Sequence, residues 1–206
     1  MKRFTVHLVL ALALGAGLVV ALLWLTGHRG ITVAAAPERR SLAAGEVITV
    51  CLDGGCDYSS IQSAVDAAQP GAVIKVAAGV YTGVNNYGGL RQVVYISKTI
   101  TIRGGYTTTN WMIPYPVTQP TTLDAEGQGR VIFITGDISP TIEGLNITGG
   151  SATGLGGCHG GDAGGGVYVK SAATISKNQI FGNTALYGGG LHVELGNVAI
   201  LSNSIV

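Results

Sequence analysis

Hydrophobic residues from Ala72 onward occur in short runs that are separated by glycine and asparagine. Valine, isoleucine and threonine dominate these runs, which is typical of β-strands bounded by turns. No helical period runs through them. The pattern therefore predicts an all-β fold with short strands within residues 73–76, 93–96, 99–102, 131–134, 141–142 and 145–147.

One segment before these strands has a helical pattern instead. Apolar side chains recur there at positions i, i+3, i+4 and i+7, namely Ile61, Ala64, Val65 and Ala68. This spacing places them on one face of a helix. Ser59 or Ser60 can cap its N-terminus, and the Pro70-Gly71 pair ends it. We therefore expect a short amphipathic helix that precedes the β region.

Two segments near the C-terminus repeat each other. Residues 164–169 read Gly-Gly-Gly-Val-Tyr-Val and residues 188–193 read Gly-Gly-Gly-Leu-His-Val, an offset of 24 residues. Another strand repeats with an offset of 25, because Ile175, Asn178 and Ile180 recur as Ile200, Asn203 and Ile205. Ile142 and Ile147 fit one coil earlier if residues 149–166 bulge outward as a glycine-rich insert. Such a repeat predicts stacked coils.

A coil of three short strands cannot bury its own inward side chains, so it must stack on its neighbours. We therefore expect a parallel β-helix (solenoid) over residues 47–206, with the helix as its N-terminal cap. The sequence stops within a strand, at Ser204-Ile205-Val206. We expect either a β-helix truncated at its C-terminal end or another chain that covers this end. The equivalent turn residues Asn178 and Asn203 are expected to form a structural ladder.

The N-terminus has the pattern of an export segment. Lys2 and Arg3 precede an apolar run over residues 4–25, and three alanines precede Pro37. Residues 1–36 are predicted to be either a signal peptide or an uncleaved N-terminal anchor, since the run approaches the roughly 20 residues that span a bilayer. Residues 37–46 are a linker. The remainder is expected to be extracellular or at the cell surface, with membrane contact only through an uncleaved N-terminal segment.

Composition changes this picture in two ways. The chain holds 33 glycines among 206 residues, but 47% hydrophobic residues can build a core, so the glycines are expected to mark turns. The net charge is +1, and no basic block is present that could bind a polyanion. We therefore expect no nucleic-acid partner.

The cysteines predict one local crosslink. Cys51 and Cys56 enclose a short turn-forming loop, and thiols of an exported domain can oxidise. A disulfide between them is the expected state, which leaves Cys158 free. Their spacing does not match a tetrahedral metal set, and we expect no metal site.

Residues 58–68 followed by residues 71–81 resemble the N-terminal part of pectinesterases and their relatives in the pectin lyase-like superfamily. That resemblance covers residues 47–206 and implies a right-handed parallel β-helix. It is specific for the fold and unspecific for activity. The Gly-Gly-Gly-Val-Tyr-Val and Phe181-Gly182-Asn183 elements also resemble, more weakly, repeats of polymorphic outer-membrane proteins. In these, the Phe-to-Asn spacing is one residue longer.

The resemblance implies two kinds of catalytic site. Polysaccharide lyases of this superfamily hold calcium with clustered carboxylates and use an arginine or lysine as base, whereas pectinesterases use two aspartates and an arginine. Aligning the coils brings no such set to adjacent strands. The candidates that lie close in sequence are Asp124, Glu126 and Arg130, and their glycine-containing segment is more simply interpreted as a solvated turn.

An aromatic column is a better candidate for a binding site. Side chains alternate along a strand, so Tyr95, Phe133, Tyr168 and His192 point outward if their neighbours point inward. A flat strip of rings can hold the sugar rings of a polysaccharide. The alternative is that these rings only stabilise neighbouring coils, or that residues 106–120 cover them.

These observations favour a non-catalytic secreted or cell-surface protein that binds a polysaccharide or another component of the cell envelope. The alternative is a polysaccharide lyase or carbohydrate esterase. No cofactor is expected, and calcium is expected only under the lyase alternative.

Overall fold

The computed structural model describes residues 45–206. The expected signal peptide or anchor, and the expected linker up to residue 44, lie outside the described residues. Among residues 45–206, no helix is both long and apolar enough to span a membrane.

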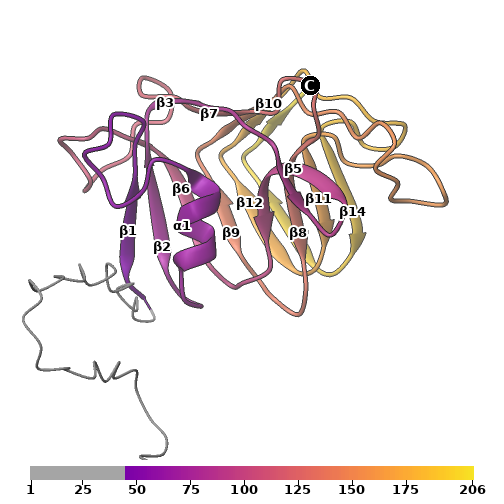
Figure 1. Ribbon diagram of the computed structural model, residues 1–206, viewed down its shortest axis with the longest axis horizontal. Coiled ribbons are helices and arrows are strands. Elements are labelled where there is room, and N and C mark those ends of the chain that lie inside the picture. The colour runs from indigo at the N-terminus through magenta and orange to yellow at the C-terminus, as the bar shows by residue number, and fades with distance from the viewer. Residues whose placement is uncertain (1–44) are drawn as a thin grey trace, which may run out of the picture. The chain divides into compact units, whose positions relative to one another are not determined.

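Three sheets of mainly parallel strands form the fold, and the predicted all-β class is confirmed (Figure 1). Sheet A contains β1 (Val47–Val50), β2 (Val73–Ala77), β6 (Thr101–Tyr106), β9 (Thr141–Glu143), β12 (Ala173–Ser176) and β15 (Val198–Leu201). Sheet B contains β3 (Gly79–Tyr81), β7 (Thr121–Asp124), β10 (Asn146–Thr148), β13 (Gln179–Ile180) and β16 (Ser204–Ile205). Sheet C contains β4 (Asn85–Tyr87), β5 (Leu90–Ile96), β8 (Arg130–Thr135), β11 (Val167–Lys170) and β14 (Leu191–Leu195).

From β2 onward the chain visits sheets A, B and C in that order and then returns to sheet A. Each return pairs the new strand in parallel with the preceding strand of the same sheet, as in β9 with β12 and β11 with β14. The antiparallel exception is β4, which forms a hairpin with β5. The register therefore carries equivalent residues into contact from one coil to the next.

The core consists of aliphatic side chains that stack in this register. In sheet A one stack is Ile48, Ile74, Ile102, Ile142 and Ile175, all of them buried. Sheets B and C add parallel stacks that include Leu123 with Ile147 and Ile132 with Val167. Burying one such side chain stabilises a fold by about 1.5–3 kcal/mol. The stacks therefore supply the main stabilisation.

Helix α1 (Ile61–Ala67) lies at the N-terminal end, as the apolar period predicts. Ser60 is its N-cap, and its hydroxyl accepts a hydrogen bond from the Ser63 amide at 3.4 Å. The side-chain amide of Gln62 accepts from the Tyr95 backbone N–H at 2.7 Å and donates to the Tyr95 carbonyl at 3.3 Å. It thereby occupies hydrogen-bonding groups at the edge of β5.

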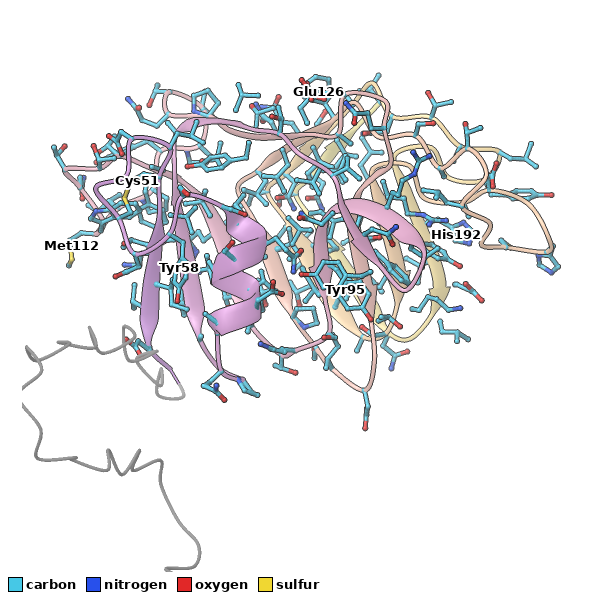
Figure 2. The ribbon with its side chains drawn as sticks, in the orientation of Figure 1. Cys51, Tyr58, Tyr95, Met112, Glu126 and His192 are labelled. Atoms are coloured by element: carbon cyan, nitrogen blue, oxygen red, sulfur yellow. A yellow bond between two sulfur atoms is a disulfide. The ribbon has the colours of Figure 1, made fainter. Side chains whose placement is uncertain are left out.

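The predicted disulfide joins Cys51 to Cys56, with a Cα–Cα distance of 5.7 Å, and Cys158 is free. The crosslink closes the loop that follows β1. Both the disulfide loop and α1 thus belong to the N-terminal end of the described chain (Figures 1 and 2).

The turns from sheet A to sheet B repeat a left-handed residue. Gly144, Lys177 and Ser202 have φ values of +69°, +56° and +53° at equivalent positions. The next residues are Leu145, Asn178 and Asn203, and the two asparagines form the expected ladder. Asn178 Oδ1 accepts from the Leu145 N–H at 3.0 Å, and Asn203 Oδ1 accepts from the Asn178 N–H at 2.9 Å.

We predict that Asn178→Ala lowers the free energy of unfolding by about 1–3 kcal/mol, because the Leu145 N–H and Ile142 carbonyl lose a buried partner. Urea denaturation monitored by circular dichroism measures this change. Asn197→Ala, in the exposed turn before β15, is the matched control and should change stability little. Equal effects of the two substitutions would contradict a structural ladder.

Candidate functional site

The predicted aromatic column is present on the outer face of sheet C. The strand register pairs Tyr95 with Phe133, Phe133 with Tyr168 and Tyr168 with His192. Successive ring centroids are 5.7, 5.2 and 5.7 Å apart. Aromatic pairs at such distances are mutually stabilising. Tyr95 and His192 mark the two ends of this four-ring set in Figure 2.

A fifth ring extends the column toward the N-terminal end. Tyr87 of β4 stacks on Tyr95 with a centroid distance of 5.0 Å and an interplanar angle of 5°. Its hydroxyl donates to a carboxylate oxygen of Asp66 at 2.8 Å. Tyr87 lies on the first strand of the β4–β5 hairpin and outside the strand repeat, so the repeat did not reveal it. The Gly88-Gly89 pair is typical of a two-residue hairpin turn and could have predicted the hairpin that carries Tyr87.

The expected exposure of the column is wrong for its two central rings. Phe133 and Tyr168 are only 5% and 3% exposed. Ala163 and Cys158 pack against them from the glycine-rich insert, residues 149–166. The insert folds back over sheet C instead of bulging outward. Tyr95 and His192 remain partly exposed at the two sides.

Residues 106–120 are not the cover that the alternative interpretation expected. Trp111 of this segment instead lies against sheet A, where Lys75 donates to the Trp111 carbonyl at 2.5 Å and the Trp111 ring stacks on Tyr106. Figure 2 shows Met112 of this segment at the opposite side of the molecule from His192.

Arg130 fastens the insert to the column. The side chain is fully buried at the start of β8. Its Nε donates to the Ala163 carbonyl at 2.9 Å, and its Nη2 donates to the Gly156 carbonyl at 2.5 Å. The guanidinium carbon lies 4.6 Å from the Tyr168 ring centroid, a cation–π distance. Burial lowers the pKa of Arg130, which the electrostatic influence of Tyr168 and Asp162 partly opposes.

Asp162 fixes the insert from within. Its two carboxylate oxygens accept hydrogen bonds from the backbone N–H groups of Gly154 and Gly156, both at 2.9 Å. These hydrogen bonds lower the pKa of Asp162. Arg130 therefore binds the carbonyl groups of the insert while Asp162 binds its N–H groups, so the two side chains define one folded loop.

The weak catalytic set Asp124, Glu126 and Arg130 does not assemble. Asp124 Oδ1 accepts from the Glu126 N–H at 2.8 Å, which closes the turn after β7. Glu126 is exposed, and Figure 2 shows it far from Tyr95 and His192. The solvated-turn interpretation suits these two carboxylates but is wrong for Arg130, which points beneath the insert. No hydrogen bond or ion pair within residues 45–206 joins Arg130 to either carboxylate.

The C-terminal end of the column carries a second charged group. The Tyr168 hydroxyl donates to a carboxylate oxygen of Glu194, and Lys170 Nζ lies 3.4 Å from that oxygen. Burial, followed by the Glu194 interaction, raises the pKa of Tyr168. The hydrogen bond from Tyr168 lowers the pKa of Glu194. Tyr168 is therefore a neutral donor that orients an ionised carboxylate.

Another carboxylate, Glu143, lies on sheet A. Arg103 Nε and Lys177 Nζ each donate to one of its oxygens at 2.7 Å. Burial raises the pKa of Glu143, but these two cations outweigh burial and hold the pKa below its ordinary value. Since both oxygens already have partners, this group joins β6, β9 and the turn at Lys177 and is not a free base.

The described residues bring together one group of three possible metal ligands, Cys51, Asp53 and Cys56. The two cysteines are joined in the disulfide, so neither supplies a thiolate. Comparison with known proteins finds no matching family model, curated protein or solved structure.

We predict that Arg130→Met loosens the insert, because the carbonyls of Gly156 and Ala163 lose charged donors that contribute about 1.5–3 kcal/mol each. The rate at which Cys158 reacts with an aromatic disulfide reagent should rise by at least about tenfold. Arg91→Met, at an exposed position of β5, is the control. Unchanged Cys158 reactivity in a folded Arg130 variant would contradict this role.

We predict a pH-dependent contribution from Glu143. Its pKa is depressed in the folded state, so its stabilisation is fully present above the unfolded pKa and disappears as the pH falls through the folded value. Glu143→Gln should therefore cost about 1 kcal/mol at pH 7, and this cost should shrink toward zero as the pH falls through the depressed folded-state pKa. Urea midpoints measured across this range test the difference. Glu126→Gln, at an exposed turn, is the matched control for replacing a carboxylate by an amide.

Proposed function

We propose that this chain is an exported, right-handed parallel β-helix of the pectin lyase-like type. Its proposed role is to bind a polysaccharide or another cell-envelope component without catalysing a reaction. The repeated order of sheets A, B and C and the in-register aliphatic stacks support the solenoid. Two basic residues followed by an apolar run within residues 1–36 support export of the chain, to the cell surface or beyond.

The observation that carries the binding proposal is the stacked pair of Tyr87 and Tyr95. Both rings are partly exposed, and they lie on the outer face of sheet C beside the carboxylate of Asp66. Tyrosine combines an apolar ring face with a polar hydroxyl, and a sugar offers the matching apolar face and hydroxyl rim. The buried rings of Phe133 and Tyr168 serve in this proposal as a rigid base for the exposed pair.

The proposed binding surface is therefore the Tyr87–Tyr95 pair and not a uniform strip of rings along the whole column. The insert separates the Tyr87–Tyr95 pair from His192 at the other side of the column. A ligand that contacts the tyrosines therefore lies along the N-terminal side of the insert. His192 is a secondary contact under this proposal, and Phe133 and Tyr168 are positioning residues.

The alternative is a polysaccharide lyase or carbohydrate esterase, with calcium as the cofactor in the lyase case. Such chemistry needs one carboxylate bound to metal or protonated while a neighbour stays ionised beside a base. Within residues 45–206, Asp124 and Glu126 stay in their turn and Glu143 is neutralised by two cations. This arrangement favours the binding function.

We predict that the purified chain is retained on at least one member of a panel of acidic and neutral insoluble polysaccharides. Tyr95→Ala and Tyr87→Ala should each weaken retention by about two- to tenfold, since an aromatic contact contributes about 0.5–1.5 kcal/mol. Tyr115→Ala removes an exposed tyrosine outside the column and is the control.

The same samples, with and without calcium, report the competing function through the ultraviolet absorbance of unsaturated sugar products. Retention without product formation is expected. Calcium-dependent product formation would replace the binding function by the lyase alternative. Retention that neither Tyr87→Ala nor Tyr95→Ala affects would exclude the tyrosine pair as the site.

A further inference from the structure

Two fully buried polar side chains lie on adjacent strands of sheet C. Gln92 of β5 and Arg130 of β8 are register partners, and both are 0% exposed (Figure 1). Within residues 45–206, Gln92 Oε1, Gln92 Nε2 and Arg130 Nη1 have no hydrogen-bond partner. A buried polar atom without a partner costs free energy, and native proteins contain few of them. Three such atoms on neighbouring strands indicate a ligand.

Both side chains point to the outer face of sheet C, on the side of the glycine-rich insert. Leu90 packs against the buried cluster that contains Phe133 and Tyr168. Gln92 follows two residues later on β5 and shares this face, because side chains alternate along a strand. Arg130 lies over the Phe133 and Tyr168 rings, and its Nε and Nη2 bind carbonyls of the insert. The site is therefore enclosed and admits only a small ligand.

The charge of Arg130 indicates what kind of ligand fits. Its guanidinium is buried, and no ion pair within residues 45–206 involves it. Asp162 influences Arg130 electrostatically, but its carboxylate oxygens accept from the N–H groups of Gly154 and Gly156. A buried charge without a partner is costly. An anion beside Arg130 Nη1 would offset this cost.

The balance of hydrogen-bonding groups also favours an anion. Arg130 Nη1 and Gln92 Nε2 each carry two N–H groups, whereas Gln92 Oε1 is the one acceptor among the three unpartnered atoms. Donors remain in excess after Oε1 accepts one N–H from Arg130. A water molecule would bring further donors into this enclosed place, whereas an anion only accepts.

We propose that Gln92 and Arg130 bind one small monovalent inorganic anion, such as chloride, beneath the insert. Arg130 Nη1 and Gln92 Nε2 donate to the anion, while Arg130 Nε and Nη2 keep their carbonyl partners in the insert. The anion offsets the buried charge and thereby holds the insert closed over the aromatic column. This inference rests neither on carbohydrate binding nor on export.

The probe for this site is chloride itself, compared with gluconate at equal ionic strength, because gluconate is too large for an enclosed site. Cys158 of the full chain should react with an aromatic disulfide reagent at least about tenfold more slowly in chloride, the factor expected when chloride exceeds its dissociation constant tenfold. Gln92→Met keeps Arg130 and its bonds to the insert, but it should bring the ratio of the two rates close to one. Arg91→Met, exposed on the same strand, should keep the wild-type ratio.

Crystals of the full chain grown in bromide provide an independent measurement, because anomalous scattering locates this ion. We expect a bromide peak between Gln92 and Arg130 that Gln92→Met removes. Such a peak supports the proposal even where Cys158 reacts without opening of the insert. Equal rates in chloride and gluconate together with no bromide at this position would overturn it. A chloride effect that Gln92→Met leaves unchanged would also overturn it, because the anion would then act elsewhere.

Discussion

Each round of the chain through sheets A, B and C adds one strand to each sheet and cannot bury its inward side chains alone, so each round depends on the next for its core. The in-register stack from Ile48 to Ile175 is the direct result. That dependence fixes the strand order, because a shift by one residue would turn the whole apolar set outward. It also aligns everything on the outer faces. The aromatic column and the asparagine ladder therefore both follow from the register that core stacking imposes.

The surface of sheet C is determined mainly by the glycine-rich insert, which interrupts the repeat of strands. Residues 149–166 enter between β10 and β11, and their glycines let the backbone approach the sheet closely: a Cβ at Gly164 would lie 2.7 Å from the Tyr168 Cβ. Arg130 satisfies the carbonyls of this loop in a place that water does not reach. The resulting surface has a covered centre, with the partly exposed Tyr87–Tyr95 pair at one side and the partly exposed His192 at the other.

The sequence was informative wherever a feature recurs or is local. Helix α1 with Ser60, the Cys51–Cys56 disulfide, the asparagine ladder and the alignment of Tyr95 with Phe133, Tyr168 and His192 all follow from periodicity or short spacing. The fold-back of the insert, the burial of Arg130 and the position of Tyr87 did not follow. Each depends on a single non-repeating loop, where glycine permits many backbone paths and no neighbouring coil dictates one.

The N-terminal position of α1 and the disulfide loop bears on how the protein acquires its structure. A polypeptide is synthesised from its N-terminus, so the disulfide loop and α1 are available before the later strands exist. Each new segment then meets a finished strand edge on which it can pair, and paired residues of adjacent parallel strands lie between 24 residues (Leu123 and Ile147) and 42 residues (Gly79 and Thr121) apart in sequence. Folding can thus proceed as templated growth in one direction, with the Asn178 and Asn203 turns acting as register marks for each added layer.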